Sequence, residues 1–524
     1  MRSANGIAAL VLMAILVGSS ALHPAYAQAP SGDAGTAAAP PAEAPADRVA
    51  DSVVKVFATQ RYPDVYKPWT KQAPREVTGS GVVIDGKRIL TAAHVVLYAN
   101  QVQVQANQAG DKISATVQAM APGIDLAVLT LDDDSFFRTH PALPRLTTLP
   151  EIKDTVMTYG FPTGGTSLSI TKGIVSRIEY AFYSFPASGL RIQIDAALNS
   201  GNSGGPAVAG DKMIGLAFSS LRDAQNIGYI IPCEEIELFL ADVADGRYDG
   251  KPGMFDDFQT LDNPALRTFL KLDKAVRGVV VTAPYDEAPD YPLKKWDVIT
   301  KIGDVPIDEE GMVKVRENLR VRFIYLIQKI ARNGRVPLTI VRQGKESAVQ
   351  MPLAPTRPML LPDLGGAYPS YFVYGPLVFS RASVQFVRGL ASGNNGATLL
   401  ARLSAIGSPL VTRLGDKPRS PDEDLVLVSA PLFPHRVSTG YANPAGRVVR
   451  AVNGIPIRNL RHLVEVLRDS KAEFTVVEFE GREIESLVFS HREALAATEE
   501  ILTDNGIRSQ GTPDTLAVWN AKPR

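Results

Sequence analysis

Between residues 49 and 232 the sequence consists of short β-branched runs separated by turn residues. The clearest runs are "SVVKVFAT", "GSGVVI", "RILTAAHVV", "QVQVQA", "LAVLTL", "SLSITKGIVSRIE" and "MIGLAF". Many short strands without a long helical period are typical of an all-β barrel or sandwich. The pair Asp85-Gly86 between two apolar runs predicts a tight hairpin, and its second strand leads directly into His94. The sequence therefore predicts a mostly β unit over residues 48–246.

Beyond this unit the chain must divide further, because 524 residues are too many for one hydrophobic core. Apolar spacing over residues 234–244 predicts a helix that closes the first unit, and a Gly- and Pro-containing linker follows. We expect a second folded unit over 254–355 and a third over 366–500. Residues 501–524 are expected to be a tail that frays from Gly511 onward.

The second and third units share a pattern, "DVITKIGDVPI" in one and "VVRAVNGIPI" in the other. Helical stretches are predicted over 322–332 and 460–467, among several strands. We interpret the shared pattern as a weak internal repeat of a small α+β module.

The N-terminus has the layout of a secretory signal sequence. Arg2 precedes an apolar run from Ile7 to Val17, and small residues then end in Ala25-Tyr26-Ala27. We expect cleavage after Ala27, which makes 1–27 a signal peptide, with an uncleaved membrane anchor as the alternative. The Ala- and Pro-rich stretch 28–47 is expected to be a flexible linker. The predicted location is the periplasm, with the anchored protein facing it as the alternative.

Composition and charge exclude several functions. Lys plus Arg and Asp plus Glu both number 55, so no net field favours a polyanion, and we expect no nucleic-acid partner. Cys233 is the only cysteine and cannot form an intramolecular disulfide. Its apolar neighbours favour a small buried hydrophobe over a nucleophile. No Walker A, paired CxxC or HExxH pattern is present, so we expect no cofactor and no metal.

The most informative string is "IDAALNSGNSGGPAV", which places Ser203 among glycines. Glycines on both sides let the backbone turn tightly and expose its amides, so that a hydroxyl and an anion-stabilising pocket are presented together. Two interpretations compete. Gly201-x-Ser203-x-Gly205 fits the nucleophile elbow of α/β-hydrolases, in which the histidine follows the serine, and it also fits barrels with the order His, Asp, Ser.

The distribution of histidines favours the second order. Three of the six histidines lie in later units, and the flanks of Ser203 lack the strand, turn and helix alternation of an elbow. His94 lies at the end of a strand, whereas His140 has the sequence context of an exposed loop. Asp125 opens the strand "LAVLTL" after a Pro-Gly turn, and the run 132–134 of aspartates is typical of a solvated loop. Asp125 is therefore the favoured acid, although such a residue alone is as often an ordinary strand cap.

The strings "TAAHVV", "IDLAVLTL", "YGFPTGG" and "GNSGGP" occur in an order that resembles the HtrA/Deg serine proteases. "QTLDNPALR", "GVVVTA", "DVITKIGDVPI" and "NGIPIRNLRHLVEVL" are similar to the two PDZ-type regions of the plant Deg-type branch. The resemblance covers about residues 50 to 490. It implies a chymotrypsin-like double β-barrel protease domain over 48–246, followed by PDZ-like domains over 254–355 and 366–500.

By this resemblance Ser203 is the nucleophile, His94 the general base and acid, and Asp125 the orienting carboxylate. An imidazole must accept the serine proton because a hydroxyl is a weak nucleophile at neutral pH. The oxyanion hole is expected at Gly201, Asn202 and Ser203, with backbone amides as donors.

A specificity pocket is expected to involve Leu216, Ala217, Phe218, Ser219 and Ile227. The strand after the nucleophile carries no acidic residue there, so a small or medium apolar residue is expected before the cleaved bond. The alternative is that these side chains only fill the core.

The expected carboxylate-binding loop of the first PDZ-like unit is Gly253-Met254-Phe255. Asp256 and Asp257 follow it directly, and their charges would repel a C-terminal carboxylate. This unit is therefore expected to be occluded or to serve in assembly.

The sequence thus predicts an ATP-independent serine endopeptidase that degrades unfolded or damaged proteins in the cell envelope. Its partners would be unfolded or misfolded proteins, without stable membrane insertion after signal cleavage. The family resemblance implies in addition a homo-oligomer, a trimer or a multiple of one. The alternatives are a PDZ-bearing chaperone or scaffold that holds unfolded chains and, with less support, an esterase of the elbow type.

Overall fold

The computed structural model describes residues 47–522 apart from 185, 221–226, 393–394 and 483. The expected signal peptide at 1–27 and nearly all of the expected linker at 28–47 lie outside the described residues. No helix in the part of the chain that the structure describes is long and apolar enough to cross a lipid bilayer.

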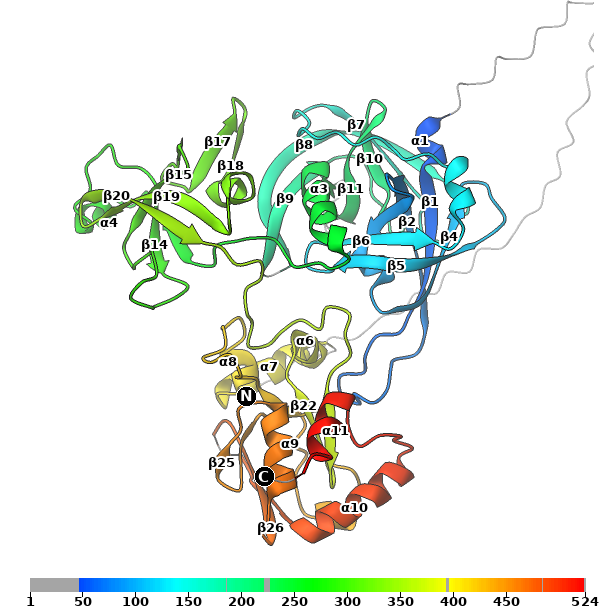
Figure 1. The fold of residues 1–524 in the computed structure, drawn as a ribbon, viewed down its shortest axis with the longest axis vertical. Helices are drawn as coiled ribbons and strands as arrows, with labels where there is room; N and C mark the ends of the chain where they lie inside the picture. The colour runs from blue at the N-terminus through cyan, green and yellow to red at the C-terminus, as the bar shows by residue number, and fades with distance from the viewer. Residues whose placement is uncertain (1–46, 185, 221–226, 393–394, 483, 523–524) are drawn as a thin grey trace, which may run out of the picture. The chain divides into compact units, whose positions relative to one another are not determined.

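The first six strands close into an antiparallel barrel in the order β1-β2-β3-β6-β5-β4 (Figure 1). They are β1 (Val53–Gln60), β2 (Arg75–Ile84), β3 (Arg88–Ala92), β4 (Ala99–Ala106), β5 (Ile113–Ala121) and β6 (Leu126–Leu131), accompanied by α1 (Arg48–Asp51), α2 (Ala93–Val96) and η1 (Asp134–Arg138). The predicted hairpin joins β2 to β3, with Ile84 opposite Arg88 and Gly86 at a φ of 79°. The hairpin thereby delivers the chain into α2, which contains His94.

A second closed barrel follows in the order β10-β11-β12-β9-β8-β7. Its strands are β7 (Thr155–Gly160), β8 (Ser169–Ser184), β9 (Ala187–Ile194), β10 (Pro206–Ala209), β11 (Lys212–Ser220) and β12 (Gly228–Pro232), and α3 (Cys233–Asp242) and η2 (Val243–Asp245) come after them. The predicted closing helix is therefore present as α3. One buried apolar cluster contains residues of both barrels and of this helix, among them Leu90, Leu216 and Phe239. The expected double-barrel fold is confirmed.

The part of the chain after the two barrels, called the second module below, is built on the sheet β13-β14-β15-β19-β20, with β16 added beside β15. Its elements are β13 (Asp257–Thr260), α4 (Pro264–Phe269), β14 (Val279–Ala283), β15 (Val298–Ile302), β16 (Val305–Pro306), β17 (Met312–Arg316), β18 (Leu319–Arg322), η3 (Phe323–Leu326), α5 (Ile327–Ile330), β19 (Arg335–Arg342) and β20 (Lys345–Pro352). The helix predicted over 322–332 is thus split into a 3-10 turn and one α-helical turn, because Arg322 still belongs to the β17–β18 hairpin.

The last module has two small sheets, β21-β22-β23 and β25-β24-β26-β27. Its elements are β21 (Tyr371–Tyr374), β22 (Leu377–Arg381), α6 (Val384–Ala391), α7 (Gly396–Ala405), α8 (Pro409–Thr412), β23 (Val426–Val428), η4 (Arg436–Ser438), β24 (Val449–Val452), β25 (Ile455–Pro456), α9 (Leu460–Asp469), β26 (Phe474–Phe479), β27 (Leu487–Ser490), α10 (His491–Asp504) and α11 (Pro513–Trp519). The end of the chain differs from the prediction that it frays from Gly511. It forms α11, in which Thr515 and Val518 are buried.

The internal repeat has a structural counterpart. In the second module Ile302 pairs with Val305 across a tight turn between β15 and β16. In the last module Val452 pairs with Ile455 across the corresponding turn between β24 and β25. The two similar strings therefore form the same strand–turn–strand unit.

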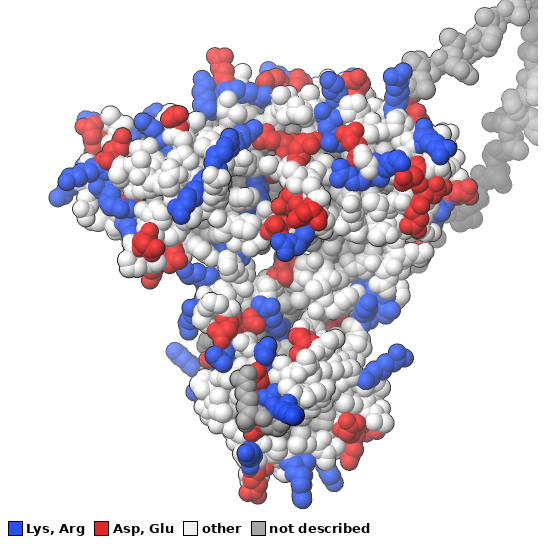
Figure 2. All heavy atoms as spheres, in the orientation of Figure 1, with Lys and Arg blue, Asp and Glu red and all other residues white. Residues whose placement is uncertain are grey.

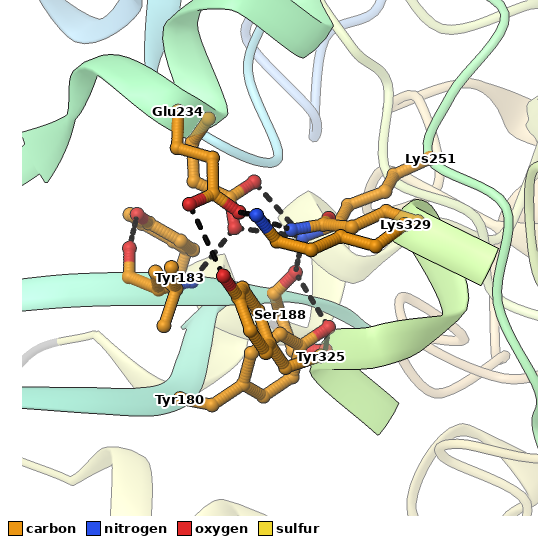
Figure 3. A network of polar contacts seen from close by, with 10 residues as sticks. Tyr180, Tyr183, Ser188, Glu234, Lys251, Tyr325 and Lys329 are labelled. Atoms are coloured by element: carbon orange, nitrogen blue, oxygen red, sulfur yellow. Dashed lines mark hydrogen bonds and ion pairs between the residues drawn. The ribbon is translucent and has the colours of Figure 1, made fainter. Parts of the chain in front are cut away.

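The second barrel and the second module share contacts through α3. Figure 3 shows that Glu234 accepts a hydrogen bond from Tyr325 and forms an ion pair with Lys329. The neighbouring Glu235 lies buried and pairs with Lys251 of the following linker at 2.9 Å. An apolar cluster also extends from strands β8 and β9 into the second module.

Surface charge agrees with the balanced composition. On the face shown in Figure 2, Lys and Arg are interspersed with Asp and Glu. Most of the ion pairs are partly exposed, and pairs of that kind contribute little to stability.

Candidate active site

Ser203 lies in the loop between β9 and β10, where two glycines shape the backbone. Gly201 has a φ of 100° and Gly204 a φ of 87°, which side chains rarely tolerate. A Cβ atom at Gly201 would lie 2.4 Å from the Phe161 carbonyl oxygen, and one at Gly204 would lie 2.1 Å from that of Ser80. Both positions therefore require glycine, and the resulting turn leaves Ser203 partly exposed.

His94 and Asp125 are joined by two hydrogen bonds. The His94 backbone N–H donates to Asp125 Oδ1 at 2.8 Å, and His94 Nδ1 lies 2.8 Å from Oδ2. An ionised carboxylate only accepts, so Nδ1 carries the proton and Nε2 is left as the acceptor. Asp125 is mostly buried, with its side chain 18% exposed, whereas the His94 side chain is 49% exposed. The structure thus contains an oriented imidazole whose acceptor nitrogen is free for a proton.

The environment of His94 also tunes its basicity. Burial disfavours the imidazolium, but the hydrogen bond and the negative charge of Asp125 favour it more, and the pKa of His94 is raised. A stronger base is better suited to accept a proton from a serine hydroxyl.

The Ser203 hydroxyl does not engage this imidazole in the structure. Its Oγ donates to the carbonyl oxygen of Phe218 at 3.5 Å. Among the described residues no hydrogen bond joins Ser203 to His94. The three side chains come from two barrels that share a core, and catalytic hydrogen bonds of this kind often tighten only when substrate is bound.

The backbone amides beside Ser203 differ in whether they have an acceptor within the described chain. The Thr163 N–H donates to the Ser200 carbonyl at 2.7 Å. The C=O and N–H groups of a trans peptide point in opposite directions, so the Gly201 N–H points away from Thr163. Neither this amide nor that of Ser203 donates to an acceptor within the described chain. Asn202 differs from its predicted role, because its amide donates to Asn199 at 3.0 Å and its buried Oδ1 has no hydrogen-bond partner among the described residues.

Ser80 is a supporting residue that the sequence did not reveal. This fully buried serine on β2 donates from Oγ to the Gly201 carbonyl at 2.8 Å and accepts from the Phe161 N–H at 2.8 Å. Its own N–H donates to the Ser203 carbonyl at 2.8 Å. The first barrel therefore holds the loop of the second barrel that contains Ser203. A polar residue between glycines in "TGSGVVI" was the only available signal.

Comparisons with known proteins identify two types of domain in the chain. The model of the trypsin-like peptidase domain matches residues 79–216, and the PDZ domain model matches residues 362–514. Protease Do-like 2, chloroplastic, of Arabidopsis thaliana is 36% identical over 478 residues, which cover 90% of this chain and 76% of that protein. The chain belongs to the HtrA/Deg family of serine proteases.

Further relatives belong to the same family. Protease Do-like 4, mitochondrial, of Arabidopsis thaliana is 33% identical, with 89% of this chain and 86% of that protein covered. Among solved structures, the HtrA-type protease AlgW with tripeptide is similar at a TM-score of 0.48 and 22% identity, covering 59% of this chain and 96% of that one. As a member of the HtrA/Deg family, the chain is a serine endopeptidase.

The residues expected to line the specificity pocket of this HtrA/Deg protease lie in different environments. Leu216 is fully buried in the cluster shared by the barrels, and Ala217 is buried as well. Phe218 is partly buried, with its ring 5.3 Å from that of Tyr183, and Ile227 is also partly buried. The Ser219 side chain lies outside the described residues.

Leu198 lies next to Gly228, which follows Ile227. A Cβ atom at Gly228 would lie 2.7 Å from Leu198 Cδ1, so the glycine makes room for this side chain. Leu198 is apolar and partly buried.

The expected carboxylate loop is engaged by other parts of the chain. The Gly253 N–H donates to the Ala354 carbonyl at 3.0 Å, and the Phe255 ring lies 5.6 Å from that of Tyr285. Met254 packs against the cluster that extends into the second module. Asp256 is buried and accepts hydrogen bonds from the Tyr285 N–H and the Tyr291 hydroxyl. Burial raises the pKa of Asp256.

The remaining reactive groups lie apart from the site. Cys233 is buried, as expected, and donates from Sγ to the Met213 carbonyl at 3.1 Å. Burial raises the pKa of its thiol to about 12, so it is a poor nucleophile. The ring of His140 stacks on that of Phe136 at 4.1 Å. Within the described residues, no three His, Cys, Asp or Glu side chains gather in a way that could hold a metal ion.

Proposed function

We propose that this protease hydrolyses peptide bonds through a Ser203 acyl-enzyme, with His94 as general base and acid and Asp125 as its orienting carboxylate. Its substrates would be unfolded or damaged proteins, degraded without ATP. The single observation that carries the mechanism is the double hydrogen bond between His94 and Asp125, which leaves Nε2 as the acceptor.

The mechanism begins when substrate binding brings the Ser203 hydroxyl within reach of His94 Nε2. The imidazole accepts the proton as Oγ attacks the scissile carbonyl carbon, and Asp125 stabilises the imidazolium. The amides of Gly201 and Ser203 donate to the developing oxyanion, and one such donor contributes about 10² to 10³ in rate. The imidazolium then protonates the leaving amine, and a water activated by the same base hydrolyses the acyl-enzyme.

The decisive experiment compares the wild type with Ser203→Ala and His94→Ala. Wild-type protein should hydrolyse casein and be labelled by a fluorophosphonate at Ser203, as identified by peptide mapping. Both variants should lose both activities. Persistent hydrolysis in Ser203→Ala would overturn the mechanism, and a fully active His94→Ala would indicate an elbow-type enzyme with a downstream histidine.

We also propose a periplasmic location, and we propose that the exported chain has three domains, at 48–246, 254–355 and 366–500. The support is the signal-like N-terminal sequence, whereas the plant relatives are named chloroplastic or mitochondrial. Fractionation of the native host with an antibody against the chain tests this location.

A homo-oligomer built of trimers is proposed from the family resemblance, and light scattering on the purified chain tests it.

A further inference from the structure

Gln60 is a buried polar residue at the end of β1, close to the catalytic pair. Its side chain is almost inaccessible, with the residue 2% exposed. Its Nε2 donates to the carbonyl oxygens of His94 at 2.8 Å and of Val95 at 3.0 Å. A primary amide has two N–H donors, and Gln60 therefore uses both of them on the helix that contains the base.

These two hydrogen bonds give partners to carbonyl groups of a short helix whose Ala93, Val95 and Val96 side chains are buried in the first barrel. Helix α2 has only four residues, and its one capping hydrogen bond runs from the Leu97 N–H to the Ala93 carbonyl. Carbonyl groups in the last turn of a helix have no partner within that helix. His94 is therefore held from two sides, by Asp125 at its N–H and by Gln60 at its carbonyl.

Gln60 is also the residue from which a long loop departs. The pairing of β1 with β4 shifts register between Thr59 and Gln60, and the chain leaves the barrel there. The following loop, residues 61–74, carries aromatic side chains that contact the last module. The Tyr66 ring lies 5.4 Å from that of Phe386, and the Trp69 ring lies 5.7 Å from that of Phe433 and 6.2 Å from that of Tyr371.

A second set of contacts joins the same parts of the chain. The Tyr368 hydroxyl donates to the carbonyl oxygen of Arg61, the first residue of the loop, at 2.8 Å. The Tyr98 ring, four residues beyond His94, lies 5.7 Å from that of Tyr368 and 4.9 Å from that of Tyr62. Tyr368 therefore contacts the chain at two places, at Arg61 next to Gln60 and at Tyr98 shortly after His94.

We propose that Gln60 is a positioning residue for His94, and that the packing of loop 61–74 against the last module holds Gln60 in place. The inference rests on the proposed function, because it assumes that His94 acts on Ser203. Packing of the last module would then determine whether the base is correctly placed.

Gln60→Met tests the positioning role, since methionine keeps the length and burial of the side chain but cannot donate a hydrogen bond. In the full-length protein we expect the labelling rate of Ser203 and kcat to fall roughly tenfold or more, because misplacing a reacting group by about 1 Å costs about 100-fold. KM for a peptide should change little. The midpoint of the rise in kcat/KM with pH should also move to lower pH, because a misplaced His94 makes a weaker hydrogen bond to Asp125 and its pKa is raised less.

Gln103→Met on β4 is the matched control, since it makes the same substitution at a partly exposed position of the same barrel. It should behave as wild type. Labelling and pH dependence of Gln60→Met equal to those of wild type would overturn the inference while leaving the proposed function intact. An unlabelled wild type would overturn both.

Trp69→Ala tests the connection to the last module and leaves all barrel side chains in place, so it remains informative even if Gln60→Met fails to fold. We expect a slower labelling rate, and the double variant with Gln60→Met should be no slower than Gln60→Met alone. Trp296→Ala, which removes a partly exposed indole from the second module, should leave the rate unchanged. An unchanged rate in Trp69→Ala, or additive effects in the double variant, would contradict the connection.

Discussion

At the scale of single residues, Asp125 is the most tightly constrained member of the site. Its φ is 59°, in the left-handed region, and its carbonyl accepts a hydrogen bond from the Ala93 N–H at 3.1 Å. Asp and Asn tolerate this conformation better than other residues with a side chain, because their short polar groups hydrogen-bond locally. The position therefore needs both a carboxylate for the imidazole and a residue type that accepts a left-handed backbone.

These two requirements are separable by substitution. Asp125→Asn should keep the backbone and the fold but lose kcat by about 10⁴, since an amide can donate to the imidazole and stabilise the wrong tautomer. Asp125→Ala should lose activity and, in addition, about 1 to 2 kcal/mol of stability because of the left-handed φ. Casein hydrolysis and denaturant unfolding of both variants check this. Equal stability of the two variants would show that the backbone conformation imposes no such cost.

The pH dependence of activity follows from the raised pKa of His94. The base must be neutral, so kcat/KM should rise with pH as the imidazolium loses its proton, with a midpoint above the ordinary value of 6.5. In Asp125→Asn the favourable charge is absent and burial remains, and the midpoint of the residual activity should move to lower pH. The raised pKa also stabilises the folded protein at low pH, an effect that disappears as pH rises through the folded pKa. A midpoint unchanged by the substitution would contradict the assigned cause.

The residues that the sequence predicted are those whose chemistry is visible in a short string. His94, Asp125 and Ser203 follow from their order and from neighbouring turns, and the structure brings His94 and Asp125 within hydrogen-bonding distance. Ser80 and Gln60 were missed because each is a single polar residue within a strand, and only the folded backbone shows which carbonyl it faces.

At the scale of elements, the prediction succeeded where local chemistry is strong and failed where tertiary packing decides. The Asp85-Gly86 hairpin and the helix after Pro232 are present because turn residues and apolar spacing specify them. The stretch 322–332 instead begins as a strand, since hairpin pairing outweighs its helical pattern. Helix α11 was missed because its seven residues are too few to show a helical period, and its order comes from contacts with distant parts of the last module.

Those contacts predict that α11 stabilises the last module. Thr515 Oγ1 donates to the Tyr371 carbonyl at 2.9 Å, Arg468 Nη1 donates to the Val518 carbonyl at 2.7 Å, and the Trp519 ring lies 5.1 Å from that of Phe372. Deleting residues 511–524 should therefore destabilise the module by about 3 kcal/mol or more, given about 1.5 to 3 kcal/mol for each buried large side chain. Limited proteolysis and thermal unfolding measure the effect. Deletion of 521–524 is the control and should have none.

At the scale of the whole molecule, the barrels and the second module are connected through buried contacts that no repeat or motif predicted. The sequence indicated only a Gly- and Pro-containing linker after residue 246. Lys251 within it is largely buried, with its Nζ bonded to both oxygens of Glu235 at 2.9 Å and to the Ser188 carbonyl at 3.3 Å. Burial lowers the pKa of Lys251, but the charge of Glu235, the neighbouring Tyr180 and the hydrogen bonds to both together outweigh burial, and the net pKa is raised.

This buried pair should behave as a unit. Glu235 also accepts a hydrogen bond from the Leu190 N–H at 2.8 Å, so Glu235→Ala would leave both a buried ammonium and a buried amide without their partner. Breaking a buried pair in this way costs about 3 to 5 kcal/mol. Replacing both partners, as in Glu235→Gln with Lys251→Met, should recover most of that loss, because glutamine still accepts from Leu190 and no buried charge remains. Denaturant unfolding of the full chain measures both effects, and Arg247→Met, which breaks an exposed ion pair with Asp249 in the same linker, is the control. A double variant as unstable as Glu235→Ala would show that the loss of stability comes from altered packing of α3. Apolar contacts rather than charge would then hold the linker in place.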